Sequence, residues 1–134
     1  EFRRVLFRSA SQLFETVGQV LVLDESQIDA LGTISGSGPA YVFYLIEQLT
    51  KAAKHHGFND TDAALLVNQT FLGAAELLVA SGKTPEQLRK QVTSPNGTTE
   101  RAIARMGQTD LEAMFIEATE AALARSRELA EGKA

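Results

Sequence analysis

The sequence predicts an all-α domain, a helical bundle of about six to seven helices with one short extended segment near the N-terminus. Two long apolar segments, residues 39–57 and 60–81, have the length and composition of core helices. Capping residues, prolines and glycines divide the remainder into pieces suited to shorter helices. The short β-branched run at residues 19–23 has no partner strand in this sequence and cannot form a sheet alone.

Length and composition limit the classes of function. At 134 residues the chain is expected to form one domain, and its 44% hydrophobic content is enough for a core. A net charge of −4, with both signs interspersed, argues against nucleic acid or an anionic membrane as a partner. The absence of cysteine excludes a disulfide framework and a thiolate nucleophile, and it suits a reducing cytoplasm.

The first nine residues, Glu1–Ser9, are interpreted as foreign to the domain. They are rich in arginine and are not expected to continue as an amphipathic helix, which is typical of a translated sequencing adapter or a cloning scar. A targeting peptide is the alternative, but the apolar run is too short for a secretory signal. The domain is therefore expected to span residues 10–134, with more of the native protein preceding Ala10.

Short elements are expected between residues 10 and 39. Ala10–Gly18 is interpreted as the end of a helix that Gly18 stops, and Gln19–Leu23 as an extended segment. Asp24 and Gln27 have capping-box spacing, so a short helix is predicted over residues 28–34. Residues 35–39 then form a hinge, rich in glycine and serine, that leads into the first long helix.

The Gly36-Ser37-Gly38 motif in this hinge does not have the pattern of a dinucleotide-binding loop. Tyr41 stands where the third glycine should be, and a predicted helix, not a strand, precedes the motif. We expect the missing side chains to let helices approach closely. Direct contact with a ligand is the alternative.

The two long apolar helices need a covering layer. A membrane is disfavoured, because polar residues interrupt the second helix at Asn68, Gln69, Thr70 and Glu76. One subunit of this size is too small to cover two helices that are apolar on most of their faces. The bundle is therefore expected to interleave with a second subunit in a homo-oligomer.

His55 and His56 are the natural candidates for a metal site, but their spacing is wrong for one. Adjacent residues on a helix face about 100° apart, so they cannot chelate one ion as an i, i+4 pair would. Histidine near a helix C-terminus also complements the helix dipole. No metal site is predicted.

The last third of the chain is predicted to hold three helices. Thr84 and Gln87 form a capping box that starts a short helix through Val92. Thr109 and Glu112 form a second box, before a final helix that runs to Leu129 and frays over residues 131–134. A further helix lies between them, and its beginning carries the strongest candidate site.

This candidate site is the segment Ser94–Glu100. Ser94-Pro95 favours an extended or turn conformation, and Asn96-Gly97 tolerates a tight turn. A turn that feeds a helix N-terminus leaves backbone N–H groups pointing one way, which suits a small anion such as a carboxylate. The alternative is an ordinary loop-to-helix junction that binds nothing. A phosphate ligand is disfavoured, because the nearest basic residue is Arg101.

Two motifs resemble those of pyrroline-5-carboxylate reductases, the last enzymes of proline biosynthesis. Residues 94–99, Ser-Pro-Asn-Gly-Thr-Thr, are similar to one signature of that family, and residues 35–41 are similar to the second. Asn96 departs from the commoner pattern, which has glycine there. The resemblance covers nearly everything after Ala10.

The resemblance implies an activity for the whole enzyme, namely reduction of 1-pyrroline-5-carboxylate to L-proline with NADPH or NADH. The nucleotide would be bound mainly by a Rossmann domain that this sequence lacks, so no cofactor is expected to bind tightly here and the chain is expected to be inactive alone. The resemblance also implies a homodimer, often assembled into a ring of dimers, in the cytoplasm. No nucleic acid or membrane partner is expected.

The resemblance assigns roles to the central turn. The substrate carboxylate is expected at Ser94 and at the N–H groups of Gly97, Thr98 and Thr99, with Asn96 also lining the substrate site. Thr99 is the candidate catalytic residue, because its hydroxyl would lie near the imine nitrogen. A non-catalytic helical homodimerisation module, in which the turn is only a cap, remains the alternative.

Overall fold

The computed structural model describes residues 2–132, and this part of the chain contains helices and no strand. The all-α prediction is therefore confirmed. The α-helices are α1 Phe2–Glu15, α2 Ile28–Leu31, α3 Gly38–His55, α4 Asp60–Ser81, α5 Pro85–Gln91, α6 Thr98–Met106 and α7 Leu111–Ala130. A 3-10 turn, η1 Glu25–Gln27, and a π-helical turn, η2 Gly32–Gly36, flank α2.

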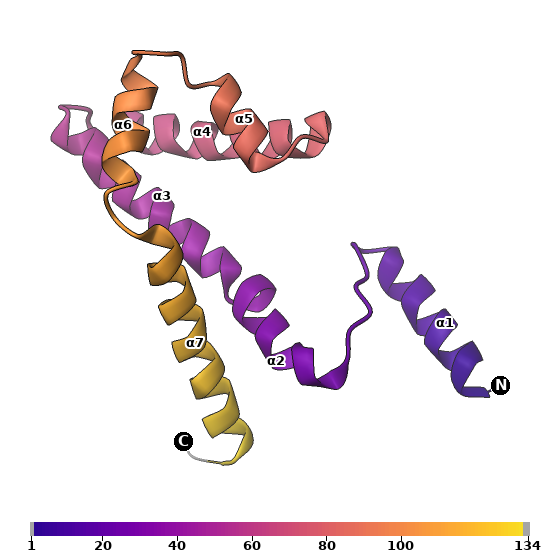
Figure 1. The fold of residues 1–134 in the computed structure, drawn as a ribbon. Helices are drawn as coiled ribbons and strands as arrows, with labels where there is room; N and C mark the ends of the chain where they lie inside the picture. The colour runs from indigo at the N-terminus through magenta and orange to yellow at the C-terminus, as the bar shows by residue number, and fades with distance from the viewer. Residues whose placement is uncertain (1, 133–134) are drawn as a thin grey trace.

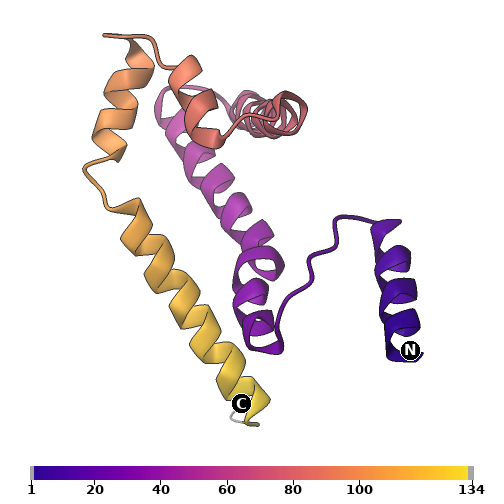
Figure 2. The ribbon, with the colours of Figure 1, turned by 45° about the vertical axis from the view of Figure 1, so that its right-hand side comes forward.

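The helices form an open frame and not a closed bundle (Figures 1 and 2). α4 follows α3 after a short turn and packs across it, so that α4 is seen end-on in Figure 2, and α7 runs beside α2 and η2. α1 stands apart at the end of the extended segment. α5 and α6 lie in the connection from α4 to α7.

The N-terminal region differs from the sequence prediction in its details. α1 runs without a break from Phe2 to Glu15, so residues 2–9 do continue as a helix, contrary to our expectation. The helix ends before Gly18, as predicted, and residues 19–23 have no regular secondary structure. The assignment of Glu1–Ser9 as foreign stays a prediction, and Glu1 lies outside the described residues.

The capping box predicted at Asp24 does not form. Its side chain accepts no capping hydrogen bond, and the contact to Gln27 is instead a backbone bond, in which Gln27 N donates to Asp24 O at 2.9 Å. A 3-10 turn therefore precedes α2. A backbone bond at i, i+3 satisfies the same groups that a side-chain cap would have served.

The predicted hinge at residues 35–39 is a nearly continuous helical segment. Ser37 N donates to Gly32 O at 3.0 Å, which closes a π-turn, and α3 begins at Gly38. A Cβ placed on Gly36 or Gly38 would meet nothing within 4 Å. The close helix packing that we expected at these glycines is therefore absent within the chain.

The small buried core lies on α4, the helix that packs against α3. The chain turns at Gly57, whose φ is +95°, and Asn59 caps α4 by accepting from Asp62 N at 2.9 Å. Ala63 and Val67, one turn apart on α4, are the buried apolar residues of the described chain. Both long helices lie where the sequence predicted them.

Side-chain caps start α5 and α7. The predicted box of α5 forms, with Thr84 N donating to Gln87 Oε1 and Gln87 N donating to Thr84 Oγ1. The cap of α7 is Asp110 and not Thr109, because the Asp110 carboxylate accepts from Ala113 N at 2.9 Å. α7 ends at Ala130; of the predicted frayed end, residues 133–134 lie outside the described chain.

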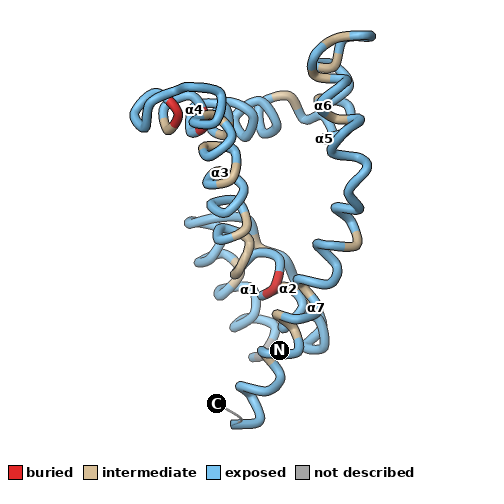
Figure 3. Tube along the Cα trace, turned by 90° about the vertical axis from the view of Figure 1, so that its left-hand side faces the viewer, coloured by how far each residue is buried: buried red, intermediate tan, exposed pale blue. Residues whose placement is uncertain are grey.

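Very little of the apolar surface is covered (Figure 3). The chain exposes 11232 Å², whereas a compact monomer of its mass exposes about 6,900 Å². Within the described residues, α4 is long and apolar enough to cross a membrane, but this rests on length and composition only, and core helices of soluble proteins meet the same criteria. The surplus area indicates that folding is completed by a further partner.

Candidate functional site

The Ser94–Gly97 segment is a tight turn of type II character. Gly97 N donates to Ser94 O at 3.0 Å, Pro95 occupies the second position, and Asn96 has φ +59°. A positive φ at the third position is what a type II turn requires. A Cβ on Gly97 would lie 3.0 Å from Ser94 O, so a larger residue would push the turn open.

The open amides of this turn are shifted by one residue from the predicted set. Gly97 N–H is used inside the turn, which corrects our expectation that it faces a ligand. Asn96 N donates to Glu100 Oε2 at 2.8 Å. The N–H groups of Thr98, Thr99 and Glu100 have no acceptor in the described chain, since the first bond of α6 is from Arg101 N to Gly97 O.

The cause of these open amides is the glycine at the N-cap of α6. In α4, α5 and α7 a side chain at the N-cap accepts from the backbone N–H three residues on. Gly97 has no side chain to do this. The helix dipole therefore presents uncapped donors at the start of α6, which favours an anionic acceptor.

Hydroxyl groups stand beside these amides. Thr70 and Thr119 donate back to carbonyls one turn earlier in their helices. Thr98 and Thr99 lie in the first turn of α6, where no such carbonyl exists, and no hydroxyl bond is formed by either residue in the described chain. Thr99 is half-buried, whereas Ser94, Asn96 and Thr98 are exposed.

The predicted site residues are thus brought together with unequal roles. The side chains of Ser94, Thr98 and Thr99 are free to meet a ligand. Gly97 and Asn96 shape the backbone. Glu100, to which the sequence prediction gave no role in binding, contributes both an open amide and a carboxylate that folds back over the turn. Its position three residues after the N-cap is the signal that could have identified it.

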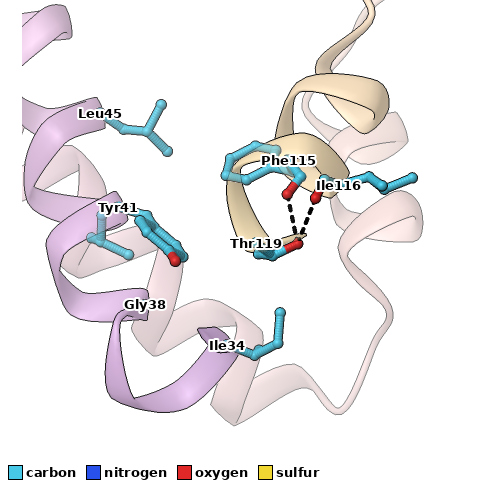
Figure 4. A pocket seen from close by; sticks show the side chains of 8 residues that line it. Ile34, Gly38, Tyr41, Leu45, Phe115, Ile116 and Thr119 are labelled. Carbon is cyan, nitrogen blue, oxygen red and sulfur yellow. Dashed lines mark hydrogen bonds between the residues drawn. The ribbon is translucent and has the colours of Figure 1, made fainter. Parts of the chain in front are cut away.

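A cavity of about 480 Å³ lies elsewhere, between α3 and α7 (Figure 4). Tyr41 and Leu45 line it from α3, and Phe115 and Thr119 from α7. The Thr119 hydroxyl donates to the carbonyls of Phe115 and Ile116, so it offers no free donor to a ligand. The sequence prediction missed this apolar cavity because its walls are more than 60 residues apart in the chain.

The carboxyl groups with a shifted pKa lie away from the turn. Hydrogen bonding to Lys51 lowers the pKa of Glu47, and hydrogen bonding to Lys54 lowers that of Asp60. Both pairs are on α3 and the start of α4. Among the described residues no group of histidine, aspartate and glutamate could hold a metal, and the rings of His55 and His56 pack edge-on at 5.5 Å.

Known proteins resemble the chain over most of its length. The family model for pyrroline-5-carboxylate reductase dimerisation matches residues 25–129. A pyrroline-5-carboxylate reductase of Pseudomonas aeruginosa is 48% identical over 123 residues, which are 91% of this chain and 45% of that protein. Pyrroline-5-carboxylate reductase 2 of Bacillus subtilis is 42% identical over 92% of this chain and 44% of its own length.

Solved structures agree in fold. The structure of a pyrroline-5-carboxylate reductase from Coxiella burnetii superposes with a TM-score of 0.87 at 42% identity, covering 92% of this chain and 46% of that one. The pyrroline carboxylate reductase of Plasmodium falciparum, solved with NADP bound, gives a TM-score of 0.78 at 29% identity, covering 89% of this chain and 48% of that one.

The chain spans less than half the length of these relatives. The matched region begins at η1 and includes the whole Ser94–Glu100 turn. Membership of a dimerisation family also explains the exposed apolar surface, because oligomerisation would cover it. From residue 25 to residue 129, the chain belongs to the pyrroline-5-carboxylate reductase dimerisation family.

Proposed function

We propose that this chain is the part of a pyrroline-5-carboxylate reductase that forms the subunit interface and holds the carboxylate of the substrate. The observation that carries this proposal is the set of open donors on the Ser94–Glu100 turn, within the region that matches the family. The whole enzyme then reduces 1-pyrroline-5-carboxylate to L-proline. We place it in the cytoplasm.

The proposed chemistry asks little of the protein beyond positioning. The nicotinamide of NADPH or NADH supplies a hydride to the imine carbon when it is bound. The N–H groups of Thr98, Thr99 and Glu100 hold the ring carboxylate, which fixes the imine carbon relative to the nucleotide. The Thr99 hydroxyl is proposed to donate a hydrogen bond to the ring nitrogen, which gains a proton during the reduction.

The described residues do not fit the nucleotide itself. The turn carries no lysine or arginine, and Arg101 is the nearest basic residue. Helix η2–α3 follows another helical turn and not a strand, so Gly36 and Gly38 do not form a phosphate-binding loop. The nucleotide is accordingly assigned to another part of the reductase.

The proposed partner is a second copy of the chain. Each chain has about 4,300 Å² of surface in excess of a compact monomer, or about 8,600 Å² for two copies, which exceeds the total of about 2,000–5,000 Å² that obligate dimer interfaces bury. The apolar faces of α3 and α4 and the walls of the α3–α7 cavity are the surfaces that a second copy would cover. A ring of such dimers is the larger assembly that we infer from the family resemblance.

The decisive variant is Thr99→Val in a reductase that contains this chain and its nucleotide-binding part. Loss of one hydrogen bond to the reacting ring should lower kcat/KM about 10- to 100-fold. The matched control is Thr61→Val, because Thr61 holds the same second position in α4 and is exposed. Kinetics that match the wild type would remove Thr99 from the site.

A second experiment needs no activity. L-Proline added to the isotope-labelled chain should shift the amide resonances of Thr98, Thr99 and Glu100. The amides of Asp60 and Thr61, at the side-chain-capped start of α4, serve as the internal reference. Resonances that stay in place at saturating proline would favour the alternative, a non-catalytic dimerisation module.

A further inference from the structure

Asn96 holds a backbone conformation that needs support. Its φ of +59° lies in the left-handed region, and it is the one described residue other than glycine with a positive φ. This conformation costs about 1 kcal/mol or more for most side chains, although asparagine tolerates it better than most. The turn can therefore open unless another contact favours it.

Glu100 supplies that contact. Its Oε2 accepts from Asn96 N at 2.8 Å across the turn. In the capping box of α5, the third helical residue Gln87 instead accepts from the N-cap amide of Thr84. In α6 the N-cap amide of Gly97 is already bound to Ser94 O, so Glu100 reaches one residue further back. The result is a capping box displaced by one residue.

The displaced capping box holds the chain in place before and after Thr98 and Thr99, the residues that carry the proposed donors. On one side, the bond from Gly97 N to Ser94 O closes the turn, and the missing Cβ of Gly97 lets it stay closed. On the other side, the bond to Glu100 ties the first turn of α6 to Asn96. Thr98 and Thr99 lie between the two tied residues, so their N–H groups and hydroxyls keep one orientation.

We propose that Glu100 is a positioning residue, whose bond to the Asn96 amide locks the left-handed turn and keeps the donors of Thr98 and Thr99 aligned for the substrate carboxylate. This inference rests on the proposed substrate site. Glu100 itself does not touch the substrate through its side chain.

The same carboxylate has an opposite electrostatic effect. A negative charge beside an anion site repels the anion that the amides attract. Glutamine keeps an oxygen that can accept from Asn96 N but removes the charge. Glu100→Gln therefore removes only the charge, whereas Glu100→Ala removes both the charge and the hydrogen bond to Asn96 N.

The test compares these two variants in the reductase that contains this chain. Glu100→Ala should raise KM for 1-pyrroline-5-carboxylate about fivefold or more, with kcat within about twofold of the wild type. Glu100→Gln should return KM to the wild-type value or below it. The control is Asp62→Ala, which removes the acid at the third position of α4. It should lower the melting temperature and leave KM unchanged.

A ligand-free measurement accompanies the kinetics. In the 134-residue chain, exchange of the Asn96 amide hydrogen with solvent should be faster in Glu100→Ala than in the wild type, and slowed again in Glu100→Gln. A wild-type KM in Glu100→Ala, or no recovery in Glu100→Gln, overturns the positioning role alone. A wild-type reductase that neither binds nor reduces the imine overturns the proposed function, and the positioning role with it.

Discussion

At the residue scale, the Ser94–Glu100 turn depends on the backbone conformation of two residues. Asn96 adopts φ +59°, and Gly97 leaves room for Ser94 O. With Gly97 at the N-cap, no side chain caps α6, so the N–H groups of Thr98, Thr99 and Glu100 have no acceptor in the described chain. The chemistry proposed for Thr98 and Thr99 depends on the backbone geometry that Asn96 and Gly97 supply.

Gly97→Ala tests this dependence. The added Cβ would approach Ser94 O to 3.0 Å, and the resulting strain should destabilise the turn by about 1 kcal/mol or more. Binding of L-proline, followed by amide shifts at Thr98, should weaken. Gly18→Ala is the matched control, because a Cβ there meets nothing within 4 Å. Equal proline affinity in the two variants would show that the tight turn is dispensable.

At the element scale, local capping decides where each helix begins. α4, α5 and α7 start at a side-chain cap, and α6 starts at glycine. The spacing of residues predicted the cap of α5 correctly. It failed at α7, where Asp110 and not Thr109 supplies the oxygen. Two adjacent candidates satisfied the same sequence pattern, and the direction from which the chain enters the helix chose between them.

Stability measurements on Asp110→Ala and Thr109→Ala can show which of the two residues caps α7. Loss of the cap at Asp110 should cost about 1 kcal/mol of folding free energy, because Ala113 N loses its acceptor. Thr109→Ala should change stability little, since its side chain caps nothing. Urea unfolding measured at one protein concentration reports both. A larger loss in Thr109→Ala would contradict the observed start of α7.

The α3–α4 turn is predicted to respond to pH. Hydrogen bonding to Lys54 lowers the pKa of Asp60 below its usual 3.8. A depressed folded-state pKa adds stability that is fully present above the unfolded-state pKa and is lost as the pH falls through the folded-state pKa. Lys54→Met should therefore lower the melting temperature at neutral pH, and this difference should disappear in acid, once the Asp60 carboxyl is protonated in the folded protein.

The control for this pH effect is Lys83→Met, because Lys83 is exposed and forms no ion pair in the described structure. Its melting temperature should follow that of the wild type at each pH. A deficit in Lys54→Met that persists in acid would mean that Lys54 stabilises the turn by an interaction other than its ion pair with Asp60, such as that of its charge with the C-terminal end of α3.

At the scale of the whole molecule, a single chain buries few of its apolar side chains. The buried apolar residues of the described chain are Ala63 and Val67, while large apolar side chains on α3, α4 and α7 remain exposed. The chain exposes 11232 Å². Association and folding are therefore expected to be coupled, and the melting temperature should rise with protein concentration.

Two matched valines test which surface associates. Val79 on α4 is 85% exposed, and Val17, outside the family-matched region, is 84% exposed. Val79→Asp should weaken association in sedimentation measurements, because it places a charge on an apolar interface. Val17→Asp should sediment as the wild type does. If Val17→Asp weakened association and Val79→Asp did not, the interface would lie in the N-terminal region.

The sequence by itself determined the helical class, both long helices, the cap of α5 and the turn at Ser94–Thr99. Each of these depends on residues within a few positions of one another, so local chemistry is sufficient. The family resemblance also rests on contiguous motifs, and the comparisons confirm it.

Tertiary structure alone decided the remainder. It showed that Gly97 N–H is used inside the turn, that Glu100 binds Asn96, that the expected hinge is a π-turn and that α3 and α7 line an open apolar pocket. These features depend on which of several competing acceptors each N–H reaches, or on segments far apart in the chain. Spacing along a sequence does not settle such competition, because distance and direction in space decide it.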